Sequence, residues 1–410
     1  MSAPILSARF DPLSPEQREN PFDVLALARR EQPVFYAPEL DLWVVTRHDD
    51  VLEVLKDHGS FSSTGALKSA SAPMPPEIVA VLAEGYPEMP YIIEIDPPLH
   101  DRIRSLVTKA FTPRRIRELE PTVHEIVNEL LDEVPAAGEA DIVELFAWPL
   151  PLRVLGHLLG LPREDLAQLH EWGNDWMLVQ QEVPLEQRLR HARGTVALQR
   201  YFVAAVERRE HEPSDDLIGA LVAARPEIDS PLTNVEIAGL PLDLMVAGHV
   251  TVTRAIGSAL RVLFEYPRLR EYLLDPGQAS RAIEEVLRLE SPAQGLFRTA
   301  TRDVRVGKTL IPSGARVMAH FASANRDECV FEEPASCRPQ REELARHLSF
   351  GKGIHFCIGA PLARLELEVA LPELLRRLPN LRPAAAPAAV REPLFFARGF
   401  AKLPVAWGGT

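Results

Sequence analysis

The stretch Phe350-Gly-Lys-Gly-Ile-His-Phe-Cys357-Ile-Gly359 decides how this 410-residue sequence is interpreted. Its three glycines allow tight backbone turns and a close approach to a flat object. The periodic run APLARLELEVALPELLRRL (360–378) predicts a helix that begins just after Cys357. A thiolate at a helix N-terminus is favoured by backbone N–H groups and by the positive end of the helix dipole. The segment therefore suits an axial metal ligand better than a closed zinc site.

The rest of the cysteine inventory narrows the chemistry further. The chain has three cysteines, at 329, 337 and 357, with no CxxC or Cys/His zinc spacing. This excludes a disulfide scaffold and a zinc ribbon. The alternative for Cys357 is a cysteine buried as a small hydrophobic side chain. The phenylalanine, glycines and histidine at fixed spacing around it favour the ligand.

Composition and charge limit the partners and the compartment. The chain is 46% hydrophobic and 25% charged, which is typical of a globular protein. Its net charge of −13 argues against nucleic acid or an anionic membrane as the main partner. The first twenty residues lack a basic segment followed by an apolar run, and 18 apolar residues never follow one another. We therefore expect a cytoplasmic protein without a membrane span.

The N-terminal part mixes strand and helix patterns. Two apolar alternations, at 33–39 and 42–48, predict a β-hairpin between helical stretches. Residues 62–98 are rich in Ser, Pro, Gly and Ala and predict a long irregular loop, which in a compact domain is often a binding element or lid.

The remainder is mostly helical. Helical periodicity extends from 100 to about 290, with 235–267 as the longest apolar candidate. Pro241 lies near the start of that candidate, so its beginning could form a separate turn. Short strand-like runs follow residue 296. We predict a mainly α fold with small peripheral β-sheets, in a single domain over 1–410.

The cysteine segment resembles the heme-binding loop of the cytochrome P450 family, Phe-Gly-x-Gly-x-His-x-Cys-x-Gly, at every defined position. The resemblance covers essentially the whole chain and implies the cytochrome P450 fold with heme b (iron protoporphyrin IX). It implies that Cys357 is the axial iron ligand, that His355 lies near a heme propionate, and that Phe350 packs on the proximal side of the ring.

A Glu-x-x-Arg pair precedes this loop. Glu285 and Arg288 are three residues apart on one helix face, an arrangement that is often only a solvated pair. Their position resembles the family's buried Glu-x-x-Arg network, which a later arginine completes. Arg341 is the candidate for that arginine, and Arg338 is the alternative.

Further basic residues match the family's propionate contacts. His100 and Arg104 follow Asp96-Pro-Pro at a spacing that places both on one helix face. The alternative is a helix start with exposed charges. By resemblance these two residues, together with Arg298, contact the heme propionates, whose burial without partners would be costly.

The central helix departs from the family pattern. Ala247-Gly248-His249-Val250-Thr251 matches the family's Ala/Gly-Gly-x-Asp/Glu-Thr, which lies over the heme. The resemblance implies that Gly248 leaves space for oxygen and that Thr251 hydrogen-bonds oxygen or an ordered water. Val250 replaces the acid, and a valine cannot relay the protons that oxygen cleavage requires.

Several substitutes for the acid remain open. Thr251, His249, Thr253 or a substrate hydroxyl could relay protons through water, and Asp243, about two turns upstream, is a weaker candidate. Position 250 could also merely pack. If the acid matters, replacing Val250 with Asp or Glu should raise the coupling of electron supply to product.

The substrate pocket is inferred by resemblance and is largely apolar. It would be lined by the 62–98 loop and by the following residues: Trp172, Trp176, Met177, Leu178, Val246, Ala247, Leu296, Phe297, Phe396 and Ala397. Each aromatic taken singly is more often part of a core than of a pocket. The implied substrate is a small apolar organic molecule that is hydroxylated or epoxidised with O2.

Electrons would come from a separate ferredoxin or flavodoxin with its NAD(P)H-dependent reductase, since the sequence shows no flavin or iron–sulfur segment. The protein is expected to be a monomer. An acidic partner could dock on six basic residues of the cysteine side, or these could form an ordinary solvated surface. They are Arg102, Lys109, Arg114, Arg115, Lys352 and Arg364.

Two competing functions stay open. A peroxide-dependent peroxygenase or another heme-thiolate enzyme is suggested by the absence of the acid, although the nearest arginine, Arg254, lies nearly one turn beyond Thr251. A heme-binding or partner-recruiting protein without catalysis is the other, but Cys357 and Thr251 are both present.

Overall fold

The computed structural model describes residues 6, 9–66, 74–136, 138–181, 183–227 and 230–408. Its contacts divide the chain into two compact units. The first unit comprises Met1–Ser63, Val123–Leu150 and Thr251–Thr410, and the second comprises Thr64–Thr122 and Pro151–Val250.

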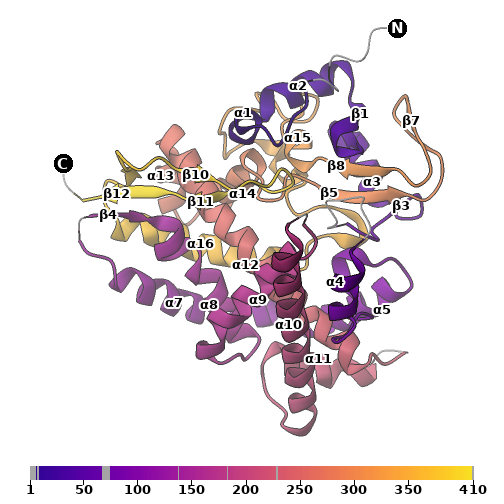
Figure 1. Ribbon diagram of the computed structural model, residues 1–410. Coiled ribbons are helices and arrows are strands. Elements are labelled where there is room, and N and C mark those ends of the chain that lie inside the picture. Colours follow the sequence, from indigo (N-terminus) through magenta and orange to yellow (C-terminus); the bar gives the residue numbers. More distant parts are fainter. Residues whose placement is uncertain are drawn as a thin grey trace. The chain divides into compact units, whose positions relative to one another are not determined.

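The first unit holds all the strands and the helices of both chain ends (Figure 1). Its helices are α1 (Pro15–Glu19), α2 (Phe22–Glu31), α3 (His48–Lys56), most of α7 (Glu120–Asp132), α13 (Leu269–Leu274), α14 (Ala279–Leu289), α15 (Phe321–Ala324) and α16 (Ala360–Arg377). Its strands are β1 (Val34–Ala37), β2 (Leu42–Val45), β3 (Phe61–Ser62), β4 (Gly138–Asp141), β5 (Leu296–Ala300), β6 (Val304–Val306), β7 (Thr309–Ile311), β8 (Arg316–Ala319), β9 (Arg382–Pro383), β10 (Val390–Arg391), β11 (Phe400–Lys402) and β12 (Pro404–Trp407).

The main sheet has the strand order β1-β2-β8-β5-β3, and smaller sheets are formed by β4-β12-β9, β10-β11 and β6-β7. The predicted hairpin is confirmed: β1 and β2 pair antiparallel, with Val34 opposite Val45. β2 pairs with β8 in parallel, and all other pairings in this sheet are antiparallel.

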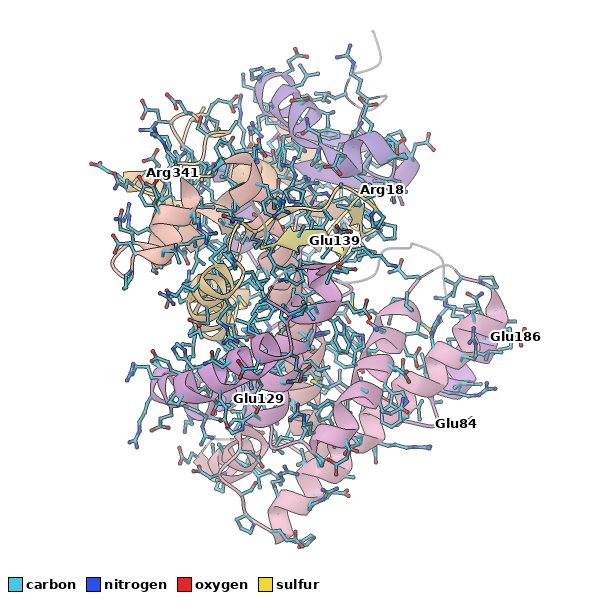
Figure 2. The ribbon with its side chains drawn as sticks, turned by 90° about the vertical axis from the view of Figure 1, so that its left-hand side faces the viewer. Arg18, Glu84, Glu129, Glu139, Glu186 and Arg341 are labelled. Carbon is cyan, nitrogen blue, oxygen red and sulfur yellow. The ribbon has the colours of Figure 1, made fainter. Side chains whose placement is uncertain are left out.

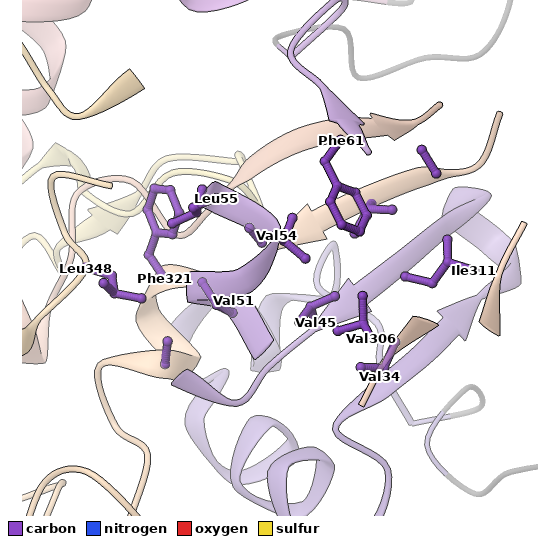
Figure 3. Packing of buried hydrophobic residues seen from close by; sticks show 14 residues of the cluster. Val34, Val45, Val51, Val54, Leu55, Phe61, Val306, Ile311, Phe321 and Leu348 are labelled. Atoms are coloured by element: carbon purple, nitrogen blue, oxygen red, sulfur yellow. The ribbon is translucent and has the colours of Figure 1, made fainter. Parts of the chain in front are cut away.

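Alternation along the strands gives the main sheet two apolar faces. One face, with Val34 and Val45, packs against Val51 and Leu55 of α3 (Figure 3). The other face belongs to a second cluster that includes residues of α2, among them Leu25. The hairpin is therefore covered on both sides and holds the end of α3 in place.

The second unit is helical. It contains α4 (Pro76–Leu82), α5 (Leu99–Ala110), α6 (Pro113–Glu118), most of α8 (Pro149–Leu158), α9 (Leu166–Leu178), α10 (Leu185–His211), α11 (Leu217–Ala224) and the first half of α12 (Asn234–Glu265). α9 and α10 pack along one another.

The central helix, α12, begins at a capping box. The Thr233 hydroxyl accepts a hydrogen bond from the Glu236 amide at 3.2 Å, and the Glu236 carboxylate accepts one from the Thr233 amide at 2.7 Å. The helix is continuous through Pro241, so the separate first turn that the proline left possible is absent. Burial of Ile237, Leu240 and Leu242 around the proline stabilises the helix against the lost hydrogen bond.

The fold class is confirmed as mainly α with small sheets, but the segment 62–98 is more ordered than its composition predicted. It contains α4, and Tyr86 and Tyr91 are hydrogen-bonded to Gln199 of α10. Residues 67–73 of that segment lie outside the described residues. Tertiary hydrogen bonds thus order a sequence that is rich in turn-forming residues.

By length and composition α12 could also cross a membrane, and it is the one such helix found among the described residues. In its most apolar window 56% is buried inside the structure, and a buried core helix meets the same criteria of length and composition. The acidic excess lies at the surface: Glu84, Glu129, Glu139 and Glu186 are all exposed (Figure 2).

Candidate heme-thiolate site

The loop before α16 is shaped by two glycines in the left-handed region, Gly351 (φ 68°) and Gly353 (φ 75°). A Cβ on Gly353 would lie 2.2 Å from the Leu55 carbonyl oxygen, because the loop packs directly on the end of α3. A Cβ on Gly351 would meet nothing closer than 3.9 Å, so only its φ angle requires glycine. A hydrogen bond from the Cys357 amide to the Phe350 carbonyl oxygen, at 3.0 Å, closes the loop.

Cys357 lies where α16 begins. Gly359 is the N-cap and provides no side-chain hydrogen bond, so the half-buried thiol is next to helix N–H groups without a capping side chain. Burial raises the pKa of Cys337 to about 12, and the charge of Asp327 raises the pKa of Cys329, so neither of these thiols favours the anion. Cys357 is thus the cysteine best placed to supply a thiolate.

The residues expected at the propionates are divided between the two units. In the first unit, Arg298 of β5 is buried, and His355 Nε2 lies 2.8 Å from the Ser63 hydroxyl oxygen. In the second unit, His100 and Arg104 lie one turn apart on α5, and His100 Nδ1 is 2.9 Å from Asp101 Oδ1. Ser63 was not among the residues that the sequence singled out, because nothing in the sequence links positions 63 and 355.

The Glu285 network is fully assembled. Arg288 donates to both Glu285 carboxylate oxygens at 2.7 and 2.9 Å, and Arg341 Nε lies 3.1 Å from each of them. All three side chains are 0–1% exposed. Arg338 contributes only its backbone amide, at 2.7 Å, while its side chain is 41% exposed and bonds to Glu332. The structure therefore places Arg341, and not the Arg338 guanidinium, on Glu285.

A second ion cluster, which the sequence did not reveal, lies next to Phe350. Arg364 donates to both oxygens of Glu284 at 2.7 and 2.9 Å, and His347 Nε2 lies 2.7 Å from Glu284 Oε2. Burial would raise the pKa of Glu284, but the hydrogen bonds from Arg364 and His347 outweigh it and hold the pKa at about 2. The Arg364 guanidinium lies 4.4 Å from the centre of the Phe350 ring. Glu284 directly precedes Glu285, but its partner is 80 residues away and has no signal in the sequence.

The prediction for the segment 247–251 of α12 requires one correction, which concerns Gly248. We predicted that Gly248 leaves space for oxygen, but a Cβ on Gly248 would contact the Leu155 side chain of α8 at 3.3 Å. The absent side chain therefore allows two helices to approach. Ala247, in contrast, is exposed in the middle of the core helix, and Thr251 is half-buried.

Asp243, which the sequence offered as a candidate for proton relay, instead binds the backbone of the segment before α5. Its Oδ2 accepts a hydrogen bond from the Ile92 amide at 2.6 Å, and burial raises its pKa well above the usual range. Arg254 is buried and is bound to Glu392 at 2.6 Å. Its guanidinium is therefore engaged in an ion pair and does not support the peroxygenase alternative, which would need an arginine at the distal helix. Thr253 is buried as well.

The expected pocket residues do not all face the same way. Leu296 and Phe297 are neighbours on β5 and belong to clusters on opposite faces of the sheet. Phe297 is 2% exposed, and its ring packs against those of Phe395 (tilted) and Phe396 (edge to face) at 5.8 and 6.0 Å. Phe297 is therefore a core residue, which corrects its assignment to the pocket.

The other aromatic candidates also make packing contacts. Trp176 meets Tyr91 edge to face at 4.9 Å, and Trp172 lies 6.4 Å from Tyr201. Met177 and Val246 line a small cavity in the second unit, Leu178 is exposed, and Ala397 is buried beside Ala293 in an isolated bridge.

Comparisons with known proteins agree with this geometry. The family model for Cytochrome P450 matches residues 279–383. The erythromycin C-12 hydroxylase of Saccharopolyspora erythraea is 38% identical over 367 residues, which are 88% of this chain and 87% of that protein. Two solved structures are similar over nearly the full length. CYP109Q5 of Chondromyces apiculatus has 35% identity, a TM-score of 0.85 and 98% coverage of both chains. CYP109E1 of Bacillus megaterium, in complex with testosterone, has 32% identity, a TM-score of 0.81, and coverage of 95% of this chain and 100% of that one.

The chain belongs to the cytochrome P450 family. It is a heme-dependent monooxygenase, an oxidoreductase whose cofactor is heme b. The described residues fit this cofactor: they contain no group of three His, Cys, Asp or Glu side chains that would compete for a metal, and they offer one cysteine at a helix N-terminus and a buried arginine on β5.

Proposed function

We propose that this protein is a cytoplasmic heme-thiolate monooxygenase that hydroxylates or epoxidises a small apolar organic substrate with O2. Electrons come from a separate ferredoxin or flavodoxin and its NAD(P)H-dependent reductase. The observation that carries the proposal is the position of Cys357, half-buried at the uncapped start of α16 in a loop held by Gly351 and Gly353.

In this proposal Cys357 would hold the heme iron through its thiolate, and the cofactor would supply the activation of O2 for insertion into a C–H or C=C bond. Phe350 would pack against the heme ring; the Arg364 guanidinium lies over the Phe350 ring and is itself held by Glu284. His100, Arg104, Arg298 and His355 neutralise the propionates, which would otherwise be buried at a high cost in free energy. Glu285, Arg288 and Arg341 stabilise the segment between α14 and the cysteine loop.

On α12, Ala247 and Thr251 are four residues apart and share a helix face. The exposed Ala247 is consistent with an open surface at this point of the helix. We assign Thr251 to hydrogen-bonding of oxygen or water. In the second unit we assign Val246 and Ala247 to the substrate-pocket lining, and in the first unit Leu296 and Ala397, whereas Phe396 packs with Phe297 in the core and is not assigned to the pocket. That lining is apolar and suits a ligand bound mainly by shape. CYP109E1, which binds testosterone, is a relative whose ligand has this character.

The proposed docking face for an acidic redox partner is smaller than the sequence indicated. Arg102, Lys109 and Arg114 are paired with Glu236, Glu227 and Glu118 at 3.4, 3.1 and 2.8 Å, and Arg115 lies 3.5 Å from Asp215. In the first unit Arg364 is bound to Glu284, while Lys352 lies over the Phe356 ring at 5.6 Å. Lys352 is thus the cation we expect to contribute most to steering, because no carboxylate is bound to it in the described residues.

We also propose that residues 1–410 fold as one monomeric domain. The chain passes four times from one compact unit to the other, and three of these passages, at 122/123, 150/151 and 250/251, lie inside α7, α8 and α12. A unit excised at these points would lose part of a helix, so neither unit is expected to fold alone.

The test is the absorbance spectrum of the reduced, carbon-monoxide-treated holoenzyme. We expect a strongly red-shifted Soret band in the wild type and its loss in Cys357→Ala. Cys337→Ala is the matched control and should keep the band, because that thiol has a raised pKa. A wild type without the band, or a Cys357→Ala variant that retains it, contradicts the proposal.

A further inference from the structure

A small cavity lies beside α12 at the position where the family's acid is missing. Its volume is about 10 Å³, and Val250 is one of the residues that line it. A cavity of this size can hold about one water molecule. A carboxylate at position 250 would extend toward the same space, so the cavity occupies the place in which an acid would act.

The cavity has a polar side made of three side chains. His170 and Asn174 come from α9, and His249 comes from α12. The two imidazole rings meet edge to face, with centroids 4.8 Å apart and an interplanar angle of 85°. Asn174 Nδ2 lies 2.7 Å from His170 Nε2, so the amide donates to that nitrogen and the ring proton is on Nδ1. A buried water requires two to four polar partners, and these three side chains can supply them.

Packing alone does not explain these residues. The remaining lining is apolar and includes Leu152, Leu169 and Met177, and the His249 side chain is buried here, while His170 and Asn174 are half-buried. Such burial costs free energy that an apolar side chain would avoid. Burial also lowers the pKa of His170, against the opposing charge of Glu171, which keeps the ring neutral near pH 7. A neutral imidazole has one N–H donor and one acceptor nitrogen and can pass a proton on.

We propose that His170, His249 and a water molecule in this cavity form a proton relay that replaces the acid absent at position 250. Each imidazole takes up a proton at one ring nitrogen and releases the proton of the other, so the ring is neutral before and after the transfer. At His170 the nitrogen that takes up the proton is Nε2, and the Asn174 amide leaves it as the proton arrives. The water accepts one proton and donates another in the same way. The relay delivers protons to the helix turn of Val250 and Thr251. It rests on the proposed function, because the turn needs protons only if oxygen is reduced there.

Two measurements on the holoenzyme test the relay without knowledge of the substrate. The first is a high-resolution crystal structure, in which we expect an ordered water within hydrogen-bond distance of the His170 or His249 ring. The second measures the fate of O2 when NADH and a ferredoxin–reductase pair supply electrons. Two electrons and two protons convert O2 to hydrogen peroxide, and four of each convert it to two water molecules. The rate of water formation is obtained from the NADH, O2 and peroxide balance.

His249→Gln and His170→Gln keep hydrogen bonding but remove the proton relay. A positioned acid–base group contributes about 10²–10⁴-fold, so we expect each variant to slow water formation at least about tenfold and to release more peroxide. Adding Val250→Asp to His249→Gln should restore water formation, because the carboxylate supplies the missing relay. His157→Gln, an exposed histidine on α8 outside the cavity, is the matched control and should change nothing.

A dry cavity in the wild type, or unchanged water formation in both histidine variants, overturns the relay. If a glutamine variant does not fold, Val250→Phe fills the cavity while keeping both imidazoles, and water formation should fall by a similar factor; an unchanged rate again overturns the relay. The red-shifted Soret band separates the two proposals: a wild type without it contradicts the heme-thiolate assignment, whereas variants that keep it test the relay alone.

Discussion

Replacing Gly353 with alanine should destabilise the cysteine loop far more than the same change at Gly351. Both glycines have positive φ, at which an L-residue costs about 1–2 kcal/mol, and the lower entropy of the unfolded alanine chain offsets about 0.4–1 kcal/mol of this. Gly351→Ala should therefore lose about 1 kcal/mol. At Gly353 the Cβ would also meet the Leu55 carbonyl oxygen at 2.2 Å, and the backbone shift that relieves this overlap adds about 1–3 kcal/mol. The expected total loss is about 2–4 kcal/mol.

The assay is urea unfolding of the holoenzyme, followed by far-UV circular dichroism and by the Soret band. Two further alanine variants serve as controls. Gly359→Ala has a φ of −76° and an ordinary 3.9 Å contact with the Cys357 sulfur, so it should be nearly neutral. Gly314→Ala has a φ of 79° with nothing within 4 Å, so it should show the backbone cost alone, outside the loop.

The spectrum distinguishes loop position from overall stability. Gly353→Ala should reduce the red-shifted band of the reduced, carbon-monoxide-treated protein, because the loop that presents Cys357 must move away from α3. Gly314→Ala should leave the band intact. Equal stability of Gly353→Ala and Gly351→Ala would refute the steric reasoning, since their φ angles are similar and the close contact with Leu55 exists only at Gly353.

Three further predictions concern buried charges. Glu284→Gln should cost about 3 kcal/mol at pH 7, because a folded pKa of about 2 against 4.5 unfolded favours the native carboxylate. This contribution is present above pH 4.5 and should fall to roughly half at pH 3, which urea unfolding at both pH values measures. Arg341→Leu should cost about 3–5 kcal/mol by leaving Glu285 with one cation fewer, whereas Arg338→Leu, at an exposed side chain, should cost under about 1 kcal/mol; similar losses would contradict the network. Asp243→Asn should raise the free energy of unfolding above pH 4, because the raised pKa of the native acid makes its ionisation unfavourable. The variant should also lose less stability than the wild type as pH increases, which calorimetric melting at pH 6 and pH 8 measures.

Local patterns accounted for much of the fold. The hairpin at 33–39 and 42–48, the long apolar helix and the helix after Cys357 all appear where the periodicity of the sequence placed them. These elements were predictable because each has a regular apolar face and clear end signals. The segment 62–98 was misjudged, because its order comes from contacts such as the bond between Tyr86 and Gln199, which composition does not reveal.

The site residues also fall into those that the sequence could predict and those that required the structure. Residues close together in sequence, such as Glu285 and Arg288, could be paired from their spacing on a helix. The choice between Arg341 and Arg338 required the structure, because the two differ by one turn of an irregular loop and only one guanidinium points at Glu285. The alternation of Leu296 and Phe297 across β5 could have been foreseen from strand geometry, had that strand been recognised as buried on both faces.

The sequence by itself determined the chemistry of the ligand: a cysteine among glycines before a helix, in a chain without a disulfide or zinc pattern. Only the tertiary structure decided which side chains contact one another in the site around that cysteine and in the rest of the molecule. The partners of Glu284, His355, Asp243 and His249 lie on other elements, from 63 to 292 residues away. Side-chain direction and burial bring such residues together, and both depend on packing between elements that no local pattern encodes.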